Sequence, residues 1–141
     1  MTDYSHFNLR VYGLWLKNEN ILVNKESIRG QIIQKFPGGG VNKGEGLHDT
    51  LRREWKEELD LGIEIGELFF VNTFLQASAW DESQVFSFYF WINGNSEKIE
   101  NKNHAEESYW LPVSKLNPDE FQLPIDKIVA RKLVDFLKKY K

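Results

Sequence analysis

Three glutamates, Glu54, Glu57 and Glu58, lie within one short stretch near the middle of the chain. An arginine, Arg53, directly precedes the first of them, and a glycine-rich segment lies a few residues upstream. Carboxylate and backbone carbonyl oxygens are the ligands that Mg²⁺ prefers, and the ion usually shares them with substrate phosphates. The residue types and their spacing therefore indicate a metal-assisted site for a phosphorylated substrate.

Residues 46–59 are predicted to form the helix that carries these glutamates. Apolar residues recur there at every fourth position, namely Leu47, Leu51, Trp55 and Leu59, which is the pattern of a helix with one buried face. On a helical projection of about 100° per residue, Glu58 falls within the apolar arc, Glu54 at its edge and Glu57 about 60° further out.

The negative charge of a carboxylate on the buried side of a helix must be balanced by a positive charge or by hydrogen bonds. Burying an ionised carboxylate costs several kcal/mol unless it is paired, and a bound divalent cation would supply the missing charge. The alternative is a solvated acidic face in which Arg53 and Glu57 form an ion pair one helical turn apart. The position of Glu58 within the arc favours the metal site.

Strands and a second helix are expected around this unit. Residues 7–26 read as a β-hairpin with a polar turn at 17–20. Further strands are expected at 31–36, 63–76, 85–92 and 109–111, a helical turn at 113–116 and a helix at 125–140. Pro37 and the three glycines after it are expected to end the third strand. Strands before, between and after two helices predict an α/β (α+β) fold, with a mixed sheet covered on both faces.

The central stretch resembles the Nudix box, G-x5-E-x7-R-E-U-x-E-E-x-G-U, where U is an apolar residue. The matching residues are Gly39, Glu45, Arg53, Glu54, Glu57, Glu58 and Leu61. The resemblance implies a single Nudix hydrolase domain over residues 1–141, built as an α/β/α sandwich with a central mixed sheet. It also implies a pyrophosphohydrolase that uses Mg²⁺, or Mn²⁺, to cleave a nucleoside diphosphate linked to another moiety.

The resemblance also implies roles for individual residues. The metal ligands would be Glu54, Glu57, Glu58 and the backbone carbonyl of Gly38. Glu54 is the first choice for the base that activates water, and Arg53 would act in catalysis by orienting the carboxylates.

Further candidates lie around the box. Gly39, Gly40 and Lys25 are candidates for substrate binding, and the alternative for Lys25 is a strand-end lysine whose stem packs along the surface while its ammonium stays in water. Outside the box, either Glu106 or Glu107 is a candidate for a second metal ligand or the base. Among the remaining candidates, His104 is expected at the surface, and Trp15 and Trp80 are expected to pack in the core or at the rim rather than stack on a base.

Three departures from the box limit the comparison. Asp60 stands where the family has glycine, at a helix end that usually requires a left-handed backbone, which Asp tolerates better than most residues. Trp55 occupies a position usually held by a smaller aliphatic residue. Gln76 and Ala77 occupy the region where some subfamilies carry a substrate-specific proline or tyrosine, so no substrate subclass is indicated.

The composition of the chain limits the classes of molecule that it is expected to bind. The net charge of −3 disfavours long nucleic acid, which requires many cations to neutralise its phosphates. The chain has no cysteine, and it shows neither a signal peptide nor an apolar run of the roughly 20 residues that span a bilayer. We therefore expect a cytoplasmic monomer or homodimer that acts on a small nucleotide.

Two alternatives to the hydrolase remain open at this stage. One is a nucleotide-binding regulator that has kept the fold and lost the reaction, against which the intact set of glutamates argues. The other is an isomerase of a prenyl diphosphate, in which a cysteine would be expected.

Overall fold

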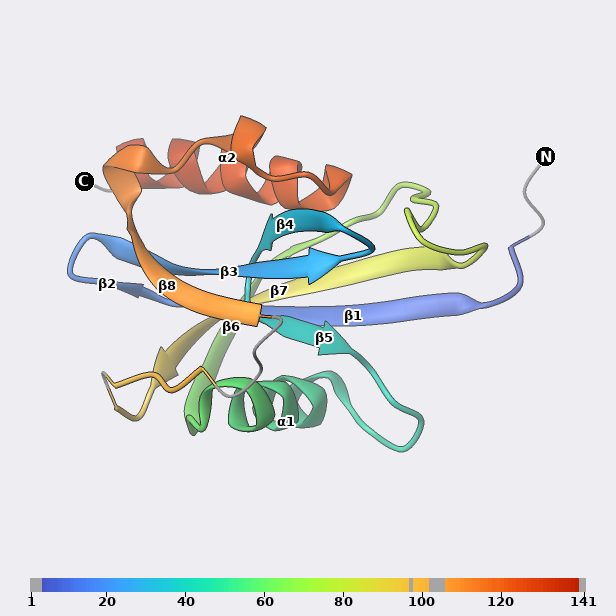
Figure 1. Ribbon diagram of the computed structural model, residues 1–141, viewed down its shortest axis with the longest axis horizontal. Helices are drawn as coiled ribbons and strands as arrows, with labels where there is room; N and C mark the ends of the chain where they lie inside the picture. Colours follow the sequence, from blue (N-terminus) through green and yellow to red (C-terminus); the bar gives the residue numbers. More distant parts are fainter. Residues whose placement is uncertain (1–3, 97, 102–105, 140–141) are drawn as a thin grey trace.

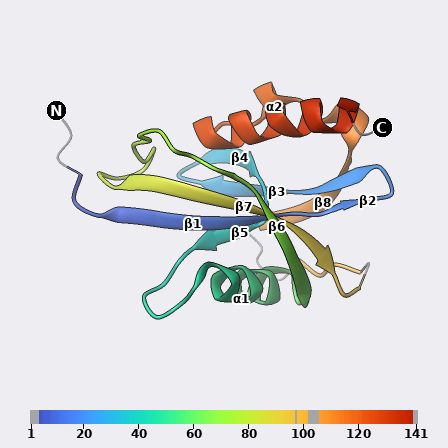
Figure 2. The ribbon, with the colours of Figure 1, turned by 180° about the vertical axis from the view of Figure 1, so that it is seen from behind.

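The computed structural model describes residues 4–96, 98–101 and 106–139. Helices α1 (Leu47–Leu59) and α2 (Pro124–Lys139) lie on opposite sides of the strands, as Figures 1 and 2 show. This arrangement confirms the predicted α+β class with strands between two helices. The helix predicted over 46–59 begins one residue later than expected, with Gly46 as its N-cap.

One four-stranded sheet contains the first strand of the chain. Its order is β5 (Gly38–Gly40), β1 (Phe7–Leu14), β7 (Gln84–Gly94) and β6 (Ile63–Val71). β1 and β7 run parallel, whereas the other two pairs are antiparallel. The sheet is therefore mixed, as predicted, although β6 ends at Val71 rather than at residue 76.

The other four-stranded sheet is built around β3 (Asn20–Ile28). β2 (Leu16–Lys17), β4 (Gln31–Lys35) and β8 (Glu106–Pro112) each pair with β3 in antiparallel orientation. β8 begins three residues before the strand predicted at 109–111, and the predicted helical turn is a 3₁₀ helix, Val113–Lys115. A second 3₁₀ helix, Pro118–Glu120, precedes α2.

The hairpin predicted over residues 7–26 is wrong in most of its length. Only residues 16–17 pair with 20–21, across a turn in which Asn18 and Glu19 have φ of 50° and 61°. β1 instead pairs with β5 and with β7, some 77 residues further along the chain, from Phe7↔Gln84 onward. A strand whose two faces both contribute to the core requires neighbours on both edges, and a local hairpin supplies only one.

The three glycines after Pro37 do not simply end a strand. They form the short edge strand β5, antiparallel to β1. Because glycines have no side chains, α1 packs directly against the backbone of β5. This contact places the helix next to the first sheet at the point where the predicted site lies.

Each helix covers its own apolar cluster. The cluster under α2 includes Tyr12, Phe36, Tyr89, Phe121 and Leu133, and the cluster under α1 includes Trp15, Leu51, Trp55, Leu59 and Phe90. Trp15 is therefore a core residue, as expected, and its ring contacts that of Trp110 edge-on at a centroid distance of 4.8 Å. The two clusters hold both helices against the strands and leave the ends of the sheets to form the site.

Candidate active site

A hydrogen bond from the tryptophan of α1 connects the helix to the residue that precedes the glycine strand β5. The indole Nε1 of Trp55 donates a hydrogen bond to the carbonyl of Pro37, at 3.1 Å. The ring also occupies space that a side chain at residue 13 would require, since a Cβ on Gly13 would lie 2.7 Å from Cζ2 of Trp55. The large residue at this position of the box is thus accommodated by a glycine on the neighbouring strand.

The helix ends in a left-handed residue, as the departure from the box predicted. Asp60 has φ of 53° and ψ of 43°, and its N–H donates to the carbonyl of Lys56. The carboxylate of Asp60 also lies 3.0 Å from Nζ of Lys56 in an exposed ion pair. Aspartate therefore fills the turn for which the family uses glycine.

Arg53 holds together the loop, the glycine strand and the helix. Its Nε donates to Oε2 of Glu45 at 2.7 Å, its Nη1 donates to Oε1 of Glu54 at 3.0 Å, and its Nη2 donates to the carbonyl of Gly40 at 3.1 Å. Arg53 also lies 3.4 Å from Glu57. The hydrogen bond from Arg53 is the main cause that lowers the pKa of Glu45 to about 2. This fixed ion pair can orient the Glu54 carboxylate without itself reacting.

Among the three helix glutamates, Glu57 is exposed, as predicted, and Glu54 and Glu58 are both partly buried. The side chain of Glu57 is 60% exposed and that of Glu54 is 15% exposed. Oε2 of Glu58 is buried. Burial, followed by a hydrogen bond with Glu54 and the negative charge of Glu106, raises the pKa of Glu58 to about 10.

The structure separates the two candidates outside the box. Glu106 is buried beside Glu58, whereas Glu107 is exposed. Lys35 lies 3.1 Å from Oε1 of Glu106 and 2.7 Å from Oε1 of Glu26. Glu106 therefore joins Glu54 and Glu58 in one acidic cluster, and Glu107 does not.

Within the described part of the chain, two carboxylate oxygens of this acidic cluster have no hydrogen-bond donor and could bind a cation. Oε2 of Glu58 and Oε2 of Glu106 are buried and have no donor among the described residues. Two ionised carboxylates in this position require either a shared proton or a bound cation.

As arranged, no three His, Cys, Asp or Glu side chains of the described part of the chain are poised to hold a metal ion. The donor set nevertheless fits Mg²⁺ in chemistry, because it consists of carboxylates next to a strand that offers backbone carbonyls. Gly38 and Gly39 lie on that strand, and a Cβ on Gly39 would lie 2.5 Å from the carboxylate of Glu54. Gly39 thus makes room for the glutamate.

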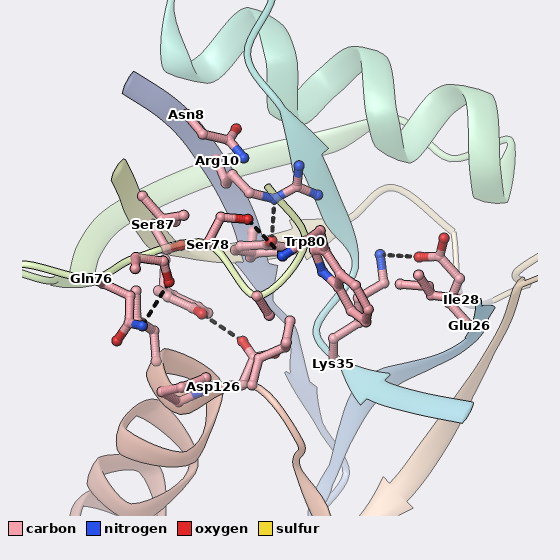
Figure 3. A pocket seen from close by; sticks show the side chains of 18 residues that line it. Asn8, Arg10, Glu26, Ile28, Lys35, Gln76, Ser78, Trp80, Ser87 and Asp126 are labelled. Atoms are coloured by element: carbon pink, nitrogen blue, oxygen red, sulfur yellow. Dashed lines mark hydrogen bonds and ion pairs between the residues drawn. The ribbon is translucent and has the colours of Figure 1, made fainter. Parts of the chain in front are cut away.

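A pocket of about 260 Å³ lies next to the acidic cluster, and Figure 3 shows the side chains that line it. It is lined by β1, β3, β4 and β7, by residues 76–80 and by the start of α2. Lys35 and Glu26 line it and also approach Glu106, so they form the wall between the pocket and the carboxylates. The pocket and the acidic cluster therefore belong to one site.

Polar and aromatic groups are placed deep in this pocket. The hydroxyl of Tyr89 donates to Oδ1 of Asp126, and both side chains are buried. Burial raises the pKa of Asp126 to about 6, against the opposing effect of the hydrogen bond from Tyr89. The ring of Trp80 also lines the pocket, with the guanidinium of Arg29 5.3 Å from its centroid.

Sequence reasoning named Gln76, Ala77 and Trp80, which line the pocket, but missed its charged residues and selected Lys25, which lies elsewhere. Arg10, Lys35 and Asp126 come from three separate elements, and only Lys35, just before the glycine segment, lies near a recognisable motif. Lys25, a candidate for substrate binding, is exposed, its Nζ lies 5.2 Å from the centroid of the Tyr109 ring, and it is not among the residues that line the pocket. His104 lies outside the described residues.

Solved structures with the same architecture are numerous. The solution structure of the E. coli ORF135 protein superimposes with a TM-score of 0.79 at 15% identity, covering 96% of this chain and 94% of that one. A MutT protein from Methanosarcina mazei Go1 gives a TM-score of 0.74 at 20% identity, covering 96% of each chain. A UDP-X diphosphatase gives 0.69 at 17% identity, covering 95% of this chain and 65% of its own. At these identities the likeness shows the fold.

Comparison of the sequence with known proteins identifies the protein family of this chain. Nudix hydrolase 2 of Arabidopsis thaliana is 43% identical over 54 residues, which are 36% of this chain and 19% of that protein. The chain thus matches only a small part of the length of this relative. The model of the NUDIX domain matches residues 7–132, which is most of the chain. The chain therefore belongs to the Nudix family. In the described part of the chain, no helix is long and apolar enough to span a membrane.

Proposed function

We propose that this protein hydrolyses the diphosphate bond of a small nucleoside diphosphate derivative with the help of Mg²⁺, which Mn²⁺ can replace. Glu54, Glu58 and Glu106 would hold the metal, together with the more exposed Glu57 and the carbonyl of Gly38. The observation that carries the proposal is the contact between this acidic cluster and the pocket, which share the Lys35 ammonium. One end of a substrate can then lie in the pocket while its diphosphate reaches the carboxylates.

The chain's own residues supply positioning and proton transfer. When bound, the metal withdraws charge from the phosphoryl oxygens and acidifies water. Glu54 is our choice to accept the proton of the attacking water, because Arg53 fixes its carboxylate through Oε1. The water oxygen bonds to one phosphorus, and the bond from that phosphorus to the bridging oxygen breaks, which leaves two phosphorylated products. A positioned base of this kind adds roughly 10²–10⁴ in rate.

The pocket would hold the nucleoside or the moiety linked to it. Trp80 offers an aromatic face for stacking, and Asp126 offers a buried carboxyl group that can exchange hydrogen bonds with a polar ring. The names of two fold neighbours, an ADP-ribose pyrophosphatase and a UDP-X diphosphatase, agree with this substrate class. A substrate of this size also suits the net charge of −3. The cytoplasmic location and the oligomeric state expected from the sequence stay predictions.

A product screen tests the proposed function. Nucleoside diphosphate sugars, dinucleoside polyphosphates and nucleoside triphosphates would each be incubated with the protein and Mg²⁺, and both products identified by mass. We expect at least one compound to be cleaved at its diphosphate, and the Glu54→Gln, Glu58→Gln, Glu106→Gln triple variant to be inactive. Binding without cleavage would instead identify a nucleotide-binding regulator.

A further inference from the structure

Among the described residues, two charged side chains of the pocket, Arg10 and Asp126, form no ion pair, and Arg10 is the cation of the two. Four charged side chains line it: Arg10, Glu26, Lys35 and Asp126. Glu26 and Lys35 form an ion pair, and Asp126 accepts a hydrogen bond from Tyr89. Among the described residues, no carboxylate forms an ion pair with Arg10. Glu54 and Glu26 act on the guanidinium only without ion-pair contact, so an anion in the pocket can still bind it directly.

Within the described residues, one hydrogen bond, to Tyr12, holds the guanidinium in place. Nε of Arg10 donates to the hydroxyl of Tyr12 at 2.7 Å, and its carbon lies 5.7 Å from the Tyr12 ring centroid. Tyr12 is buried and stacks on Tyr89 at a centroid distance of 5.1 Å. Figure 3 shows Arg10 at one end of the pocket and Asp126 at the other. Only Nε is used in this bond, so the Nη1 and Nη2 groups can bind two oxygens of one anion.

Arg10 lies at the end of the pocket next to the acidic cluster. Its Cα pairs in register with that of Gly40, and a Cβ on Gly40 would lie 3.3 Å from Nη1 of Arg10. The carbonyl of Gly40 accepts a hydrogen bond from Arg53, and the preceding residue, Gly39, contacts Glu54. The hydroxyl of Tyr12, most of all, and the negative charges of Glu54 and Glu26 raise the pKa of Arg10. Arg10 thus lies between the pocket and the carboxylates.

We propose that Arg10 binds the phosphate attached to the moiety that occupies the pocket, and that it does so without metal. This inference rests on the proposed function and adds a binding residue to that site. The metal neutralises charge at the acidic cluster, whereas Arg10 neutralises the phosphate on the pocket side. A bidentate, charge-assisted contact of this kind is among the strong hydrogen bonds in proteins. The monophosphate product that retains the pocket-bound moiety therefore keeps this contact after cleavage.

Calorimetric titration in EDTA tests the proposal directly. The probes are inorganic pyrophosphate, AMP, GMP, CMP and UMP, each titrated into the metal-free protein. We expect at least one probe to bind to the wild type, and Arg10→Gln to weaken that binding at least about 10-fold. Arg52→Gln, which removes the same charge from an exposed position of α1, should leave the affinity unchanged.

A second variant separates binding from structure. Tyr12→Phe removes the hydrogen bond to Nε but retains the guanidinium, so it should weaken binding less than Arg10→Gln does. Equal losses in the two variants would show that Arg10 acts only through the packing around Tyr12, and would overturn the proposal. So would unchanged affinity in Arg10→Gln, or the absence of any binding to the wild type in EDTA.

Kinetics with Mg²⁺ distinguish this inference from the proposed function. If the wild type cleaves a diphosphate but Arg10→Gln leaves KM and kcat unchanged, the function stands and the role of Arg10 is wrong. If Arg10 binds a monophosphate but the wild type cleaves nothing, the inference stands and the hydrolase is wrong. We expect Arg10→Gln to raise KM more than it lowers kcat, because the contact is present before and after cleavage.

Discussion

The ammonium nitrogen of Lys35 lies 3.1 Å from Oε1 of Glu106, and only 6% and 7% of the two side chains are exposed. Nζ of Lys35 is also 2.7 Å from Glu26, so one cation compensates two carboxylates from different strands. Because Glu106 lies beside Glu58 as well, this lysine occupies a place next to the proposed metal. The protein thus carries a cation of its own at the border between the pocket and the acidic cluster.

Removal of that cation should destabilise the metal-free protein and favour metal binding. We expect Lys35→Met to cost about 3 kcal/mol in the free energy of unfolding in EDTA, because it leaves buried carboxylates unpaired. Saturating Mn²⁺ should restore more stability to this variant than it adds to the wild type. Urea denaturation with and without Mn²⁺ measures both effects, with the exposed Lys43→Met as the control. Equal stabilisation of both proteins by Mn²⁺ would argue against a shared cation position.

Single replacements of the helix glutamates should abolish turnover but keep the fold. Glu54→Gln, Glu57→Gln and Glu58→Gln retain size and remove the charge that holds the metal, so kcat should fall at least about 10²-fold in each. Their effects should be strongly non-additive, because the residues act as a unit. In EDTA, Glu58→Gln should melt at or above the wild-type temperature, since it removes a buried carboxyl group. Full activity in the triple variant would place the site elsewhere.

The left-handed end of α1 predicts a tolerated substitution. Asp60 pays the cost of a left-handed backbone for a non-glycine residue, about 1 kcal/mol, and its ion pair with Lys56 is exposed and contributes about 0–1 kcal/mol. Asp60→Gly should therefore be neutral to mildly stabilising and should retain activity. Thermal melting of Asp60→Gly beside Asp60→Ala checks this, because alanine keeps the backbone cost and loses the ion pair. A clear fall in Tm for the glycine variant would show that the carboxylate contributes more than this.

Asp126 should make the stability depend on pH. Burial raises its folded-state pKa to about 6 from the ordinary 3.8, so the folded protein retains a proton that the unfolded chain has lost. Its contribution to stability is thus full below about pH 4 and is lost as the pH rises to about 6, with a difference of about 3 kcal/mol at 1.36 kcal/mol per pKa unit. Asp126→Asn lacks this titration. Urea denaturation of both proteins between pH 4 and pH 7 should show the wild type losing stability relative to the variant, and parallel curves would contradict the assignment.

The helix and its glutamates could be predicted because their evidence is local. The repeat of Leu51, Trp55 and Leu59 indicated the orientation of the helix, and this orientation correctly separated the exposed Glu57 from the partly buried Glu54 and Glu58. The left-handed backbone at Asp60 could be predicted for the same reason, because a helix end has few alternatives in conformation.

Long-range pairing could not be predicted from the same evidence. The alternation in β1 does not reveal that its partner is β7, more than 70 residues away, and so a local hairpin was predicted instead. Arg10, Lys35 and Asp126 meet only because three elements fold together, and each looks unremarkable in its own segment. The partners of Lys35 likewise come from β3 and β8, which no spacing rule connects.

Gly39 constrains the sequence through space rather than through backbone conformation. Its backbone is open to other residues, but a Cβ there would lie 2.5 Å from the carboxylate of Glu54. A saturation screen for activity would therefore find only glycine accepted at position 39, because any side chain there would displace the carboxylate of Glu54. Neither a turn nor a left-handed backbone angle requires glycine at this position. The restriction to glycine at position 39 depends on the length of the Glu54 side chain, which contacts this position. Second-site suppressors that restore the stability of Gly39→Ala should consequently arise at residue 54, where aspartate is one methylene shorter and withdraws the carboxylate from the strand, but they should not restore activity.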